Sequence, residues 1–146
     1  MINRLTFSIE INADKNTIWK ALWDEKSYRD WSGVFFEGSY AVAENWEEGS
    51  IIHFLAPDHS GIYSMIEKHI PDKTIQFKHI GNVVAGKEQP VDDEAKKWSG
   101  ATEMYSVSEG TDTNILTVEI DVLDEHVEFM TNTFPKALEK IKSNCG

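Results

Sequence analysis

Hydrophobic and polar residues alternate near both ends of the chain. Every second position is apolar from residue 5 to residue 11, and the same alternation returns from residue 116 to residue 122. A period of two is typical of a strand that buries one face and exposes the other, as in an antiparallel sheet. We therefore expect both segments in one such sheet. The apolar positions are Leu5, Phe7, Ile9, Ile11, Leu116, Val118, Ile120 and Val122.

A helical period follows the first of these strands. Asp14 is a suitable N-cap, and the apolar residues after it share one stripe of a helix. Residues 27–31 indicate a second short helix. The sequence thus predicts two short helices between the first and second strands. The stripe consists of Ile18, Trp19, Leu22 and Trp23.

The middle of the chain contains four strand-like runs, at residues 36–43, 51–56, 62–70 and 74–80. Short segments rich in Gly, Pro, Asp and Glu separate them, which is the usual chemistry of turns between neighbouring antiparallel strands. A sixth run covers residues 101–107, and a seventh begins at Asn114. The chain therefore predicts a seven-stranded sheet with a meander at its centre.

The period becomes helical again from Asp124 onward. Apolar residues recur every three or four positions, so one face of a long helix should lie on the sheet. Pro135 falls inside this helix, and its ring predicts a kink near Thr131. Such a kink is either merely tolerated or widens a cavity between helix and sheet. The apolar face consists of Val127, Met130, Phe134, Leu138 and Ile141.

The stretch from Gly81 to Gly100 is the least regular part of the sequence. Connections of this length in a compact domain are usually functional or disordered. One interpretation is a lid over a cavity mouth, anchored by Trp98. The other is a surface loop whose Trp98 simply packs on the sheet, and the sequence does not choose between them.

Composition narrows the classes of function. The 146 residues fit one domain, with 40% apolar residues and no run of about eighteen that could span a membrane. Without a signal-peptide pattern at the start, we expect a cytoplasmic protein. The net charge of -11 disfavours nucleic acid as a partner, and the single cysteine, Cys145, excludes an intrachain disulfide.

Several stretches resemble one known superfamily over nearly the whole chain. The order of elements is similar to the α+β helix-grip fold of the START-like superfamily, also called SRPBCC or Bet v 1-like. Within it, the chain most resembles bacterial homologues of the activator of the heat-shock chaperone ATPase. The matching stretches are residues 18–22 (IWKAL), 28–31 (YRDW), 49–54 (GSIIHF), 98–105 (WSGATEMY) and 134–138 (FPKAL).

The resemblance implies a single domain over residues 1–146, in which a seven-stranded curved antiparallel sheet wraps around the C-terminal helix. It also implies an apolar cavity between the two, which members of the superfamily use for lipids, sterols, polyketides and plant hormones. Because the superfamily includes binders, cyclases, hydratases and chaperone partners, the resemblance implies no single chemistry.

Ordinary catalytic motifs are missing from the sequence. There is no G-x-S-x-G, no Gly-rich phosphate loop, no H-E-x-x-H and no Cys-His pair with a plausible nucleophile. None of the five histidines forms a pair at ligand-like spacing, so we expect no metal and no cofactor. The sequence therefore favours a protein without catalytic activity, although it leaves the question open.

Three polar residues on predicted strands could meet in a cavity. Glu103 and Tyr105 share one face of their strand, and His79 lies on the preceding one. If that face is the inner one, the group could act as a general acid or base, or orient a ligand's hydroxyl or carbonyl. Alternatively, Glu103 faces solvent or pairs with Lys78, and His79 is an ordinary sheet residue.

Large apolar residues complete the candidate binding site. A one-residue error in the inward face of a middle strand would exchange all its assignments. The expected ligand-binding residues are Phe54, Tyr63, Met65, Phe77, His79, Trp98, Glu103, Tyr105, Phe129, Met130 and Phe134.

Three functions of different classes remain. The favoured one is non-catalytic binding of a small hydrophobic molecule. The second is an enzyme of the polyketide-cyclase or hydratase type, and the third is a module that interacts with a chaperone, which rests on the resemblance alone. The sequence identifies neither the ligand nor the oligomeric state.

Overall fold

The alternating segments at the two ends of the chain pair with each other. In the computed structural model, which describes residues 2–145, β1 (Ile2–Ile11) and β8 (Asn114–Leu123) run antiparallel along their whole length. Their inward residues include Ile11, Leu116 and Val118, which are almost completely buried. The strands predicted from the period of two are therefore confirmed, and they form one edge of the sheet.

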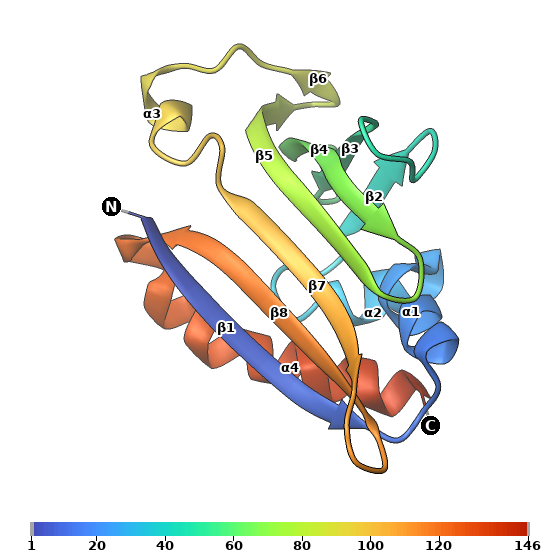
Figure 1. Cartoon of the computed structure of the whole chain (residues 1–146). Coiled ribbons are helices and arrows are strands. Elements are labelled where there is room, and N and C mark those ends of the chain that lie inside the picture. The colour runs from blue at the N-terminus through green and yellow to red at the C-terminus, as the bar shows by residue number, and fades with distance from the viewer. Residues whose placement is uncertain (1, 146) are drawn as a thin grey trace.

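The described residues form one antiparallel sheet in the order β1-β8-β7-β5-β4-β3-β2, and a short β6 pairs with β5 off this path (Figure 1). The predicted sheet is thus confirmed, with a short eighth strand added. The remaining strands are β2 (Tyr40–Ala43), β3 (Ile51–Leu55), β4 (Gly61–Ile70), β5 (Thr74–Val84), β6 (Lys87–Glu88) and β7 (Thr102–Glu109).

The two short helices before β2 are also confirmed. Asp14 caps the first of them, since its carboxylate accepts a hydrogen bond from the Thr17 amide at 2.7 Å. Ile18 and Leu22 from this helix are fully buried. The helices of the chain are α1 (Lys15–Trp23), α2 (Glu25–Ser32), α3 (Asp93–Lys96), the 3-10 turn η1 (Asp124–His126) and α4 (Val127–Cys145).

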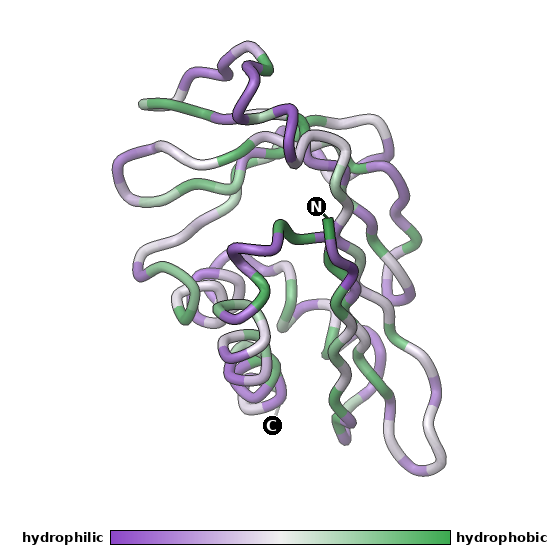
Figure 2. The backbone as a smooth tube through the Cα atoms, turned by 90° about the vertical axis from the view of Figure 1, so that its left-hand side faces the viewer, coloured by the Kyte–Doolittle hydropathy of each residue, from purple (hydrophilic) through white to green (hydrophobic). Residues whose placement is uncertain are grey.

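The long helix α4 lies on one face of the sheet, which we call the inner face; the opposite face is the outer face. Figure 1 shows α4 crossing behind β1 and β8, and Figure 2 shows it as a column beside the strands. Pro135 lies within α4, and the helix continues without interruption on both sides of it. None of the helices in residues 2–145 is long and apolar enough to cross a membrane.

The two halves of α4 are buried to different extents. The residues buried on the sheet lie in its C-terminal part, where Phe134 stacks on Phe7 of β1 with ring centroids 5.1 Å apart. In the first turn, Val127 is only partly buried and Phe129 is 48% exposed. The helix therefore seals the core at one end and leaves space beneath its first turns.

Two strand boundaries differ from the sequence prediction by four residues, and both differences involve a glycine. β5 continues beyond residue 80 to Val84. Gly81 pairs with Tyr63 of β4 and has no side chain, which leaves room for the Tyr63 ring. A Cβ at Gly81 would come within 2.9 Å of that ring. β2 begins at Tyr40 instead of residue 36, since Gly38 adopts a φ of +84° close against Pro57. Turn-forming composition alone could not separate these two roles of glycine.

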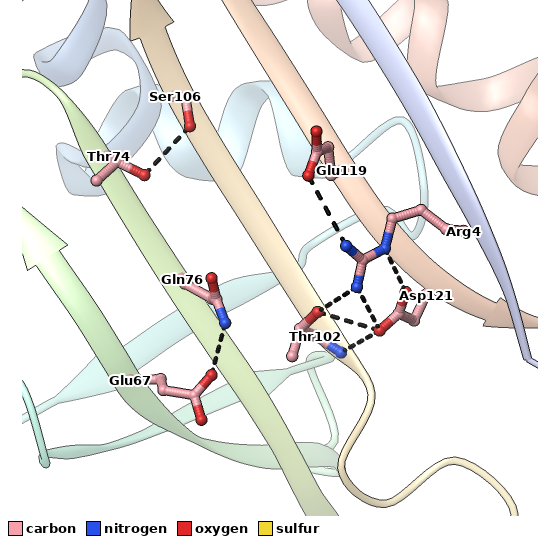
Figure 3. A network of polar contacts seen from close by, with 8 residues as sticks. All are labelled: Arg4, Glu67, Thr74, Gln76, Thr102, Ser106, Glu119 and Asp121. Carbon is pink, nitrogen blue, oxygen red and sulfur yellow. Dashed lines mark hydrogen bonds and ion pairs between the residues drawn. The ribbon is translucent and has the colours of Figure 1, made fainter.

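A polar network on the outer face ties three strands together (Figure 3). Arg4 of β1 donates to Asp121 of β8 through Nε at 2.8 Å and through Nη2 at 3.2 Å. The backbone and hydroxyl of Thr102 on β7 each donate to the same carboxylate at 3.0 Å. Burial alone would raise the pKa of Asp121, but the hydrogen bonds and charge of its partners outweigh it and hold that pKa below 3.8.

The Asp121 network predicts a pH-dependent loss of stability in the variant Asp121→Asn. A depressed pKa contributes stability that is complete above the unfolded-state value near 3.8 and disappears as the pH falls through the folded-state value. At pH 7 we expect a loss of about 1–2 kcal/mol in the free energy of unfolding. Urea unfolding at pH 7, 4 and 3 measures it, and the difference from the parent protein should shrink at low pH.

The matched control is Glu67→Gln, whose exposed side chain accepts one bond from Gln76 on the same face. We expect it to change stability by less than about 0.5 kcal/mol. An Asp121→Asn effect that is constant from pH 7 to pH 3 would contradict the assigned role.

Candidate functional site

The space beneath the first turns of α4 forms two adjoining chambers. The inner chamber, of about 350 Å³, lies between α2, the following residues 33–39, the inner face of the sheet and α4. The outer chamber, of about 430 Å³, extends toward Trp98 and the start of α4. Both chambers share the same central wall. Its members are Ile62, His79, Glu103, Met130 and Phe134.

Strand pairing places three polar side chains on this wall. Glu103 and Tyr105 are two residues apart on β7, so both point to the inner face. The His79 amide donates to the Ala101 carbonyl at 2.9 Å, which holds His79 beside the start of β7. Both Glu103 and His79 reach the cavity, and neither Glu103 facing solvent nor its pairing with Lys78 describes the structure.

The three side chains form a continuous polar chain with Ser64. Ser64 Oγ lies 2.7 Å from His79 Nδ1, and His79 Nε2 lies 3.4 Å from Glu103 Oε1. The Tyr105 hydroxyl donates to Glu103 Oε2. Ser64 and Tyr105 are almost completely buried, whereas the Glu103 side chain is 26% exposed. Glu103 is therefore the point at which this chain meets the cavity.

Aromatic rings pack against the side of the polar chain that faces away from the cavity. Trp23 packs edge-on against Tyr105 with ring centroids 4.9 Å apart, and against Phe77 at 5.4 Å. Trp31 donates its indole hydrogen to the Leu22 carbonyl at 2.9 Å, which holds that ring at the inner chamber. Because close-packed rings leave few alternative rotamers, the wall is rigid before any ligand enters.

Two phenols at the inner chamber are strongly perturbed. Burial raises the pKa of Tyr28 and of Tyr105 well above the ordinary value of 10.0, and the nearby Glu103 carboxylate raises both further. Both phenols are thus neutral hydrogen-bonding groups at physiological pH. Beside them, the buried hydroxyl of Ser32 also lines the chamber, where it interacts with the Tyr28 phenol.

Most of the residues expected from the sequence do line the two chambers. Phe77 lies behind the wall instead, fully buried against Phe54 with ring centroids 5.1 Å apart. The expected residues that line one or both chambers are Phe54, His79, Trp98, Glu103, Tyr105, Phe129, Met130 and Phe134.

Tyr63 and Met65 lie elsewhere, on the outer face of β4. Tyr63 donates its hydroxyl to the Gln89 carbonyl at 3.0 Å, and the inward positions of this strand belong to Ile62 and Ser64. Apolar side chains occupy both faces of β4, so its period does not reveal which face is inside. A register irregularity between Tyr63 and Ser64 obscures the pattern further.

One side of the inner chamber was missed by sequence reasoning. α2 and the residues after it contribute several lining groups, among them Phe35 and Phe36. The only signal was the density of aromatic residues between positions 28 and 36, which also fits an ordinary core helix. The lining residues from this segment are Tyr28, Trp31, Ser32, Phe35, Phe36 and Ser39.

Hydrogen bonds hold the stretch from residue 81 to residue 100 in place. Asp92 caps α3 by accepting from the Ala95 amide at 2.8 Å, and Ser99 donates to the Ile80 carbonyl at 2.8 Å. Trp98 lines the outer chamber. Within residues 2–145 no group of three or more His, Cys, Asp or Glu side chains is placed to hold a metal ion.

Comparisons with known proteins identify the fold. No protein-family model matches the chain, and no curated protein matches its sequence. Among solved structures, the Aha1 dimer from Colwellia psychrerythraea is 18% identical with a TM-score of 0.63, and the match covers 97% of this chain and 92% of that one. CalU16 from Micromonospora echinospora is 14% identical with a TM-score of 0.67, covering 99% and 77%.

A third similar structure, DynU16 from the dynemicin biosynthetic locus, is 10% identical with a TM-score of 0.66, covering 96% of this chain and 46% of that one. At such identities the similarity establishes the fold. The chain shares the helix-grip fold of these structures, and the fold expected from the sequence is confirmed.

The raised pKa values predict how stability changes in alkaline solution. For a phenol whose folded-state pKa is raised, the stabilisation is complete below the unfolded value near 10 and is lost as the pH rises. Each of the two residues then lowers the free energy of unfolding by up to about 1.4 kcal/mol per pH unit. The double variant Tyr28→Phe/Tyr105→Phe should therefore lose stability less steeply between pH 10 and 12, as followed by urea unfolding. Equal slopes in both proteins would contradict the assignment.

Proposed function

We propose that the protein binds a small, largely hydrophobic molecule between its sheet and α4, without transforming it. The observation that carries this proposal is a largely apolar cavity of ligand size, with Glu103 and His79 in the wall that both chambers share. Both chambers fall within the roughly 300–1,000 Å³ that ligand pockets occupy, at about 350 and 430 Å³. A lipid-like, sterol-like or polyketide-like molecule would suit this shape.

The chemistry of the lining supports the same proposal. Phe54, Phe134 and Met130 offer apolar and adaptable contacts, while Glu103 and His79 are positioned to fix the orientation of one polar group. Hydrogen bonds and close-packed rings hold the wall, so binding a ligand costs little conformational entropy in the wall. The similarity to DynU16, from a biosynthetic locus, is compatible with a small organic ligand.

A second candidate is an enzyme of the cyclase or hydratase type. It is favoured by the convergence of Glu103, His79 and Tyr105 on one cavity, which such an enzyme requires. Positioning a flexible substrate would supply much of the rate. An enzyme of this type would lose turnover in Glu103→Gln while keeping its affinity for the substrate, whereas a binder would show no turnover with either protein.

A chaperone partner stays a prediction from the resemblance. The structural similarity to Aha1 concerns the fold, and binding of the chaperone by the purified protein would have to be measured directly. The cytoplasmic location inferred from the sequence likewise stays a prediction.

A larger side chain in the shared wall tests the binding proposal. Ile62 lines both chambers, so Ile62→Trp should close the junction between them. We expect the parent protein to bind the neutral dye N-phenyl-1-naphthylamine with a dissociation constant on the order of 10 µM. The variant should bind it at least about tenfold more weakly, because the added ring occupies the same space. Dye fluorescence measures both constants.

The matched control is Met65→Trp, on the same strand but on the outer face. It should bind the dye like the parent protein, and circular dichroism checks that both variants are folded. Equal weakening by the two variants, or none by Ile62→Trp, would count against a ligand in this cavity.

A further inference from the structure

We propose that the cavity selects ligands whose polar group donates a hydrogen bond, such as an alcohol or an amine, and rejects carboxylates. This inference rests on the proposed binding function and specifies its ligand class. Its basis is the position of one acceptor, Glu103, in the wall that both chambers share.

The cavity wall carries a carboxylate and no permanent cation. No lysine or arginine among residues 2–145 lines either chamber, whereas Glu103 lines both. His79 also lines both chambers and His126 lines the outer one, while Asp121 turns its carboxylate to the outer face. Arg4 is not among the lining residues, and it is engaged with Asp121 on the outer face. A carboxylate ligand would therefore enter a low-dielectric space beside a like charge with no fixed cation to pair with.

The free hydrogen-bond acceptor positions of Glu103 also favour a ligand that donates a hydrogen bond. Each oxygen of a carboxylate can accept two hydrogen bonds, and each oxygen of Glu103 has one protein group near it. The Tyr105 hydroxyl donates to Oε2, and His79 Nε2 lies 3.4 Å from Oε1. One acceptor position on each oxygen is left for a ligand. The wall thus offers a donor-bearing head group two places to bind.

The donors nearest to Glu103 are already used. The single proton of the Tyr105 hydroxyl points to Glu103, and His79 Nδ1 meets Ser64 Oγ at 2.7 Å. The remaining hydroxyl groups of the inner chamber are those of Tyr28, Ser32 and Ser39, and each can accept as well as donate. Being neutral, they do not compensate the charge of a bound carboxylate.

The two phenols of the inner chamber show that a second negative charge there is unfavourable. Burial and then the charge of Glu103 disfavour ionisation of Tyr28 and of Tyr105, and raise the pKa of each. A ligand carboxylate in the same chamber meets the same two penalties. A protonated amine meets an attractive charge instead.

The experiment compares three ligands that share a dodecyl chain and differ only in head group: the alcohol, the primary amine and the carboxylate. Each displaces N-phenyl-1-naphthylamine from the parent protein at pH 7.5, below its micelle concentration. We expect the alcohol and amine to compete at least about tenfold better than the carboxylate. In Glu103→Gln, the carboxylate should come within about threefold of the alcohol, because the repelling charge is gone.

The control variant is Glu119→Gln, which removes the same charge from the outer-face network drawn in Figure 3. It should keep the preference of the parent protein. A carboxylate that competes as well as the alcohol in the parent protein would overturn the inference, with or without a folded Glu103→Gln. If the dye binds and none of the three displaces it, the head-group assignment is wrong while the cavity stands; if the dye itself does not bind, the proposed function fails as well.

Discussion

The pairing register of β7 determines the character of the cavity. Phe77 of β5 lies opposite Glu103, which lies opposite Ile120 of β8, so all three strands agree on which β7 side chains point inward. A slip of one residue would turn Glu103 and Tyr105 to the outer face and bring Thr102 and Met104 inside. The network of Arg4, Asp121 and Thr102 fixes this register from the other side of the sheet.

The cavity exists because α4 is unevenly packed. Its C-terminal part contributes Phe134 and Leu138 to the core, and Phe134 meets Phe35 with ring centroids 4.8 Å apart. Its first turns contribute Met130, only partly buried, to the wall of both chambers. A helix that is tightly bound at one end and loosely covered at the other leaves room for a ligand without weakening the core. Rings around Trp23 make the facing wall rigid.

The sequence predicts an element's orientation well when its apolar residues lie on one face only. β1, β8 and α1 have one clearly apolar face, so their existence and orientation were predicted correctly. The shared face of Glu103 and Tyr105 followed from the same rule. β4 carries apolar residues on both faces, which is why Tyr63 and Met65 were expected in the cavity. The contribution of residues 28–39 depends on how α2 docks after α1, a tertiary contact that no local pattern encodes.

We expect a ligand to lie on the inner face, against the wall shared by the two chambers. Nuclear Overhauser contacts between an unlabelled dodecanol chain and the isotope-labelled methyl groups of the protein test it most directly. We expect contacts to the methyl groups of Ile62 and Met130, which line both chambers. Contacts confined to Met65 or the half-exposed Val84 would contradict it, because they would place the ligand outside the cavity.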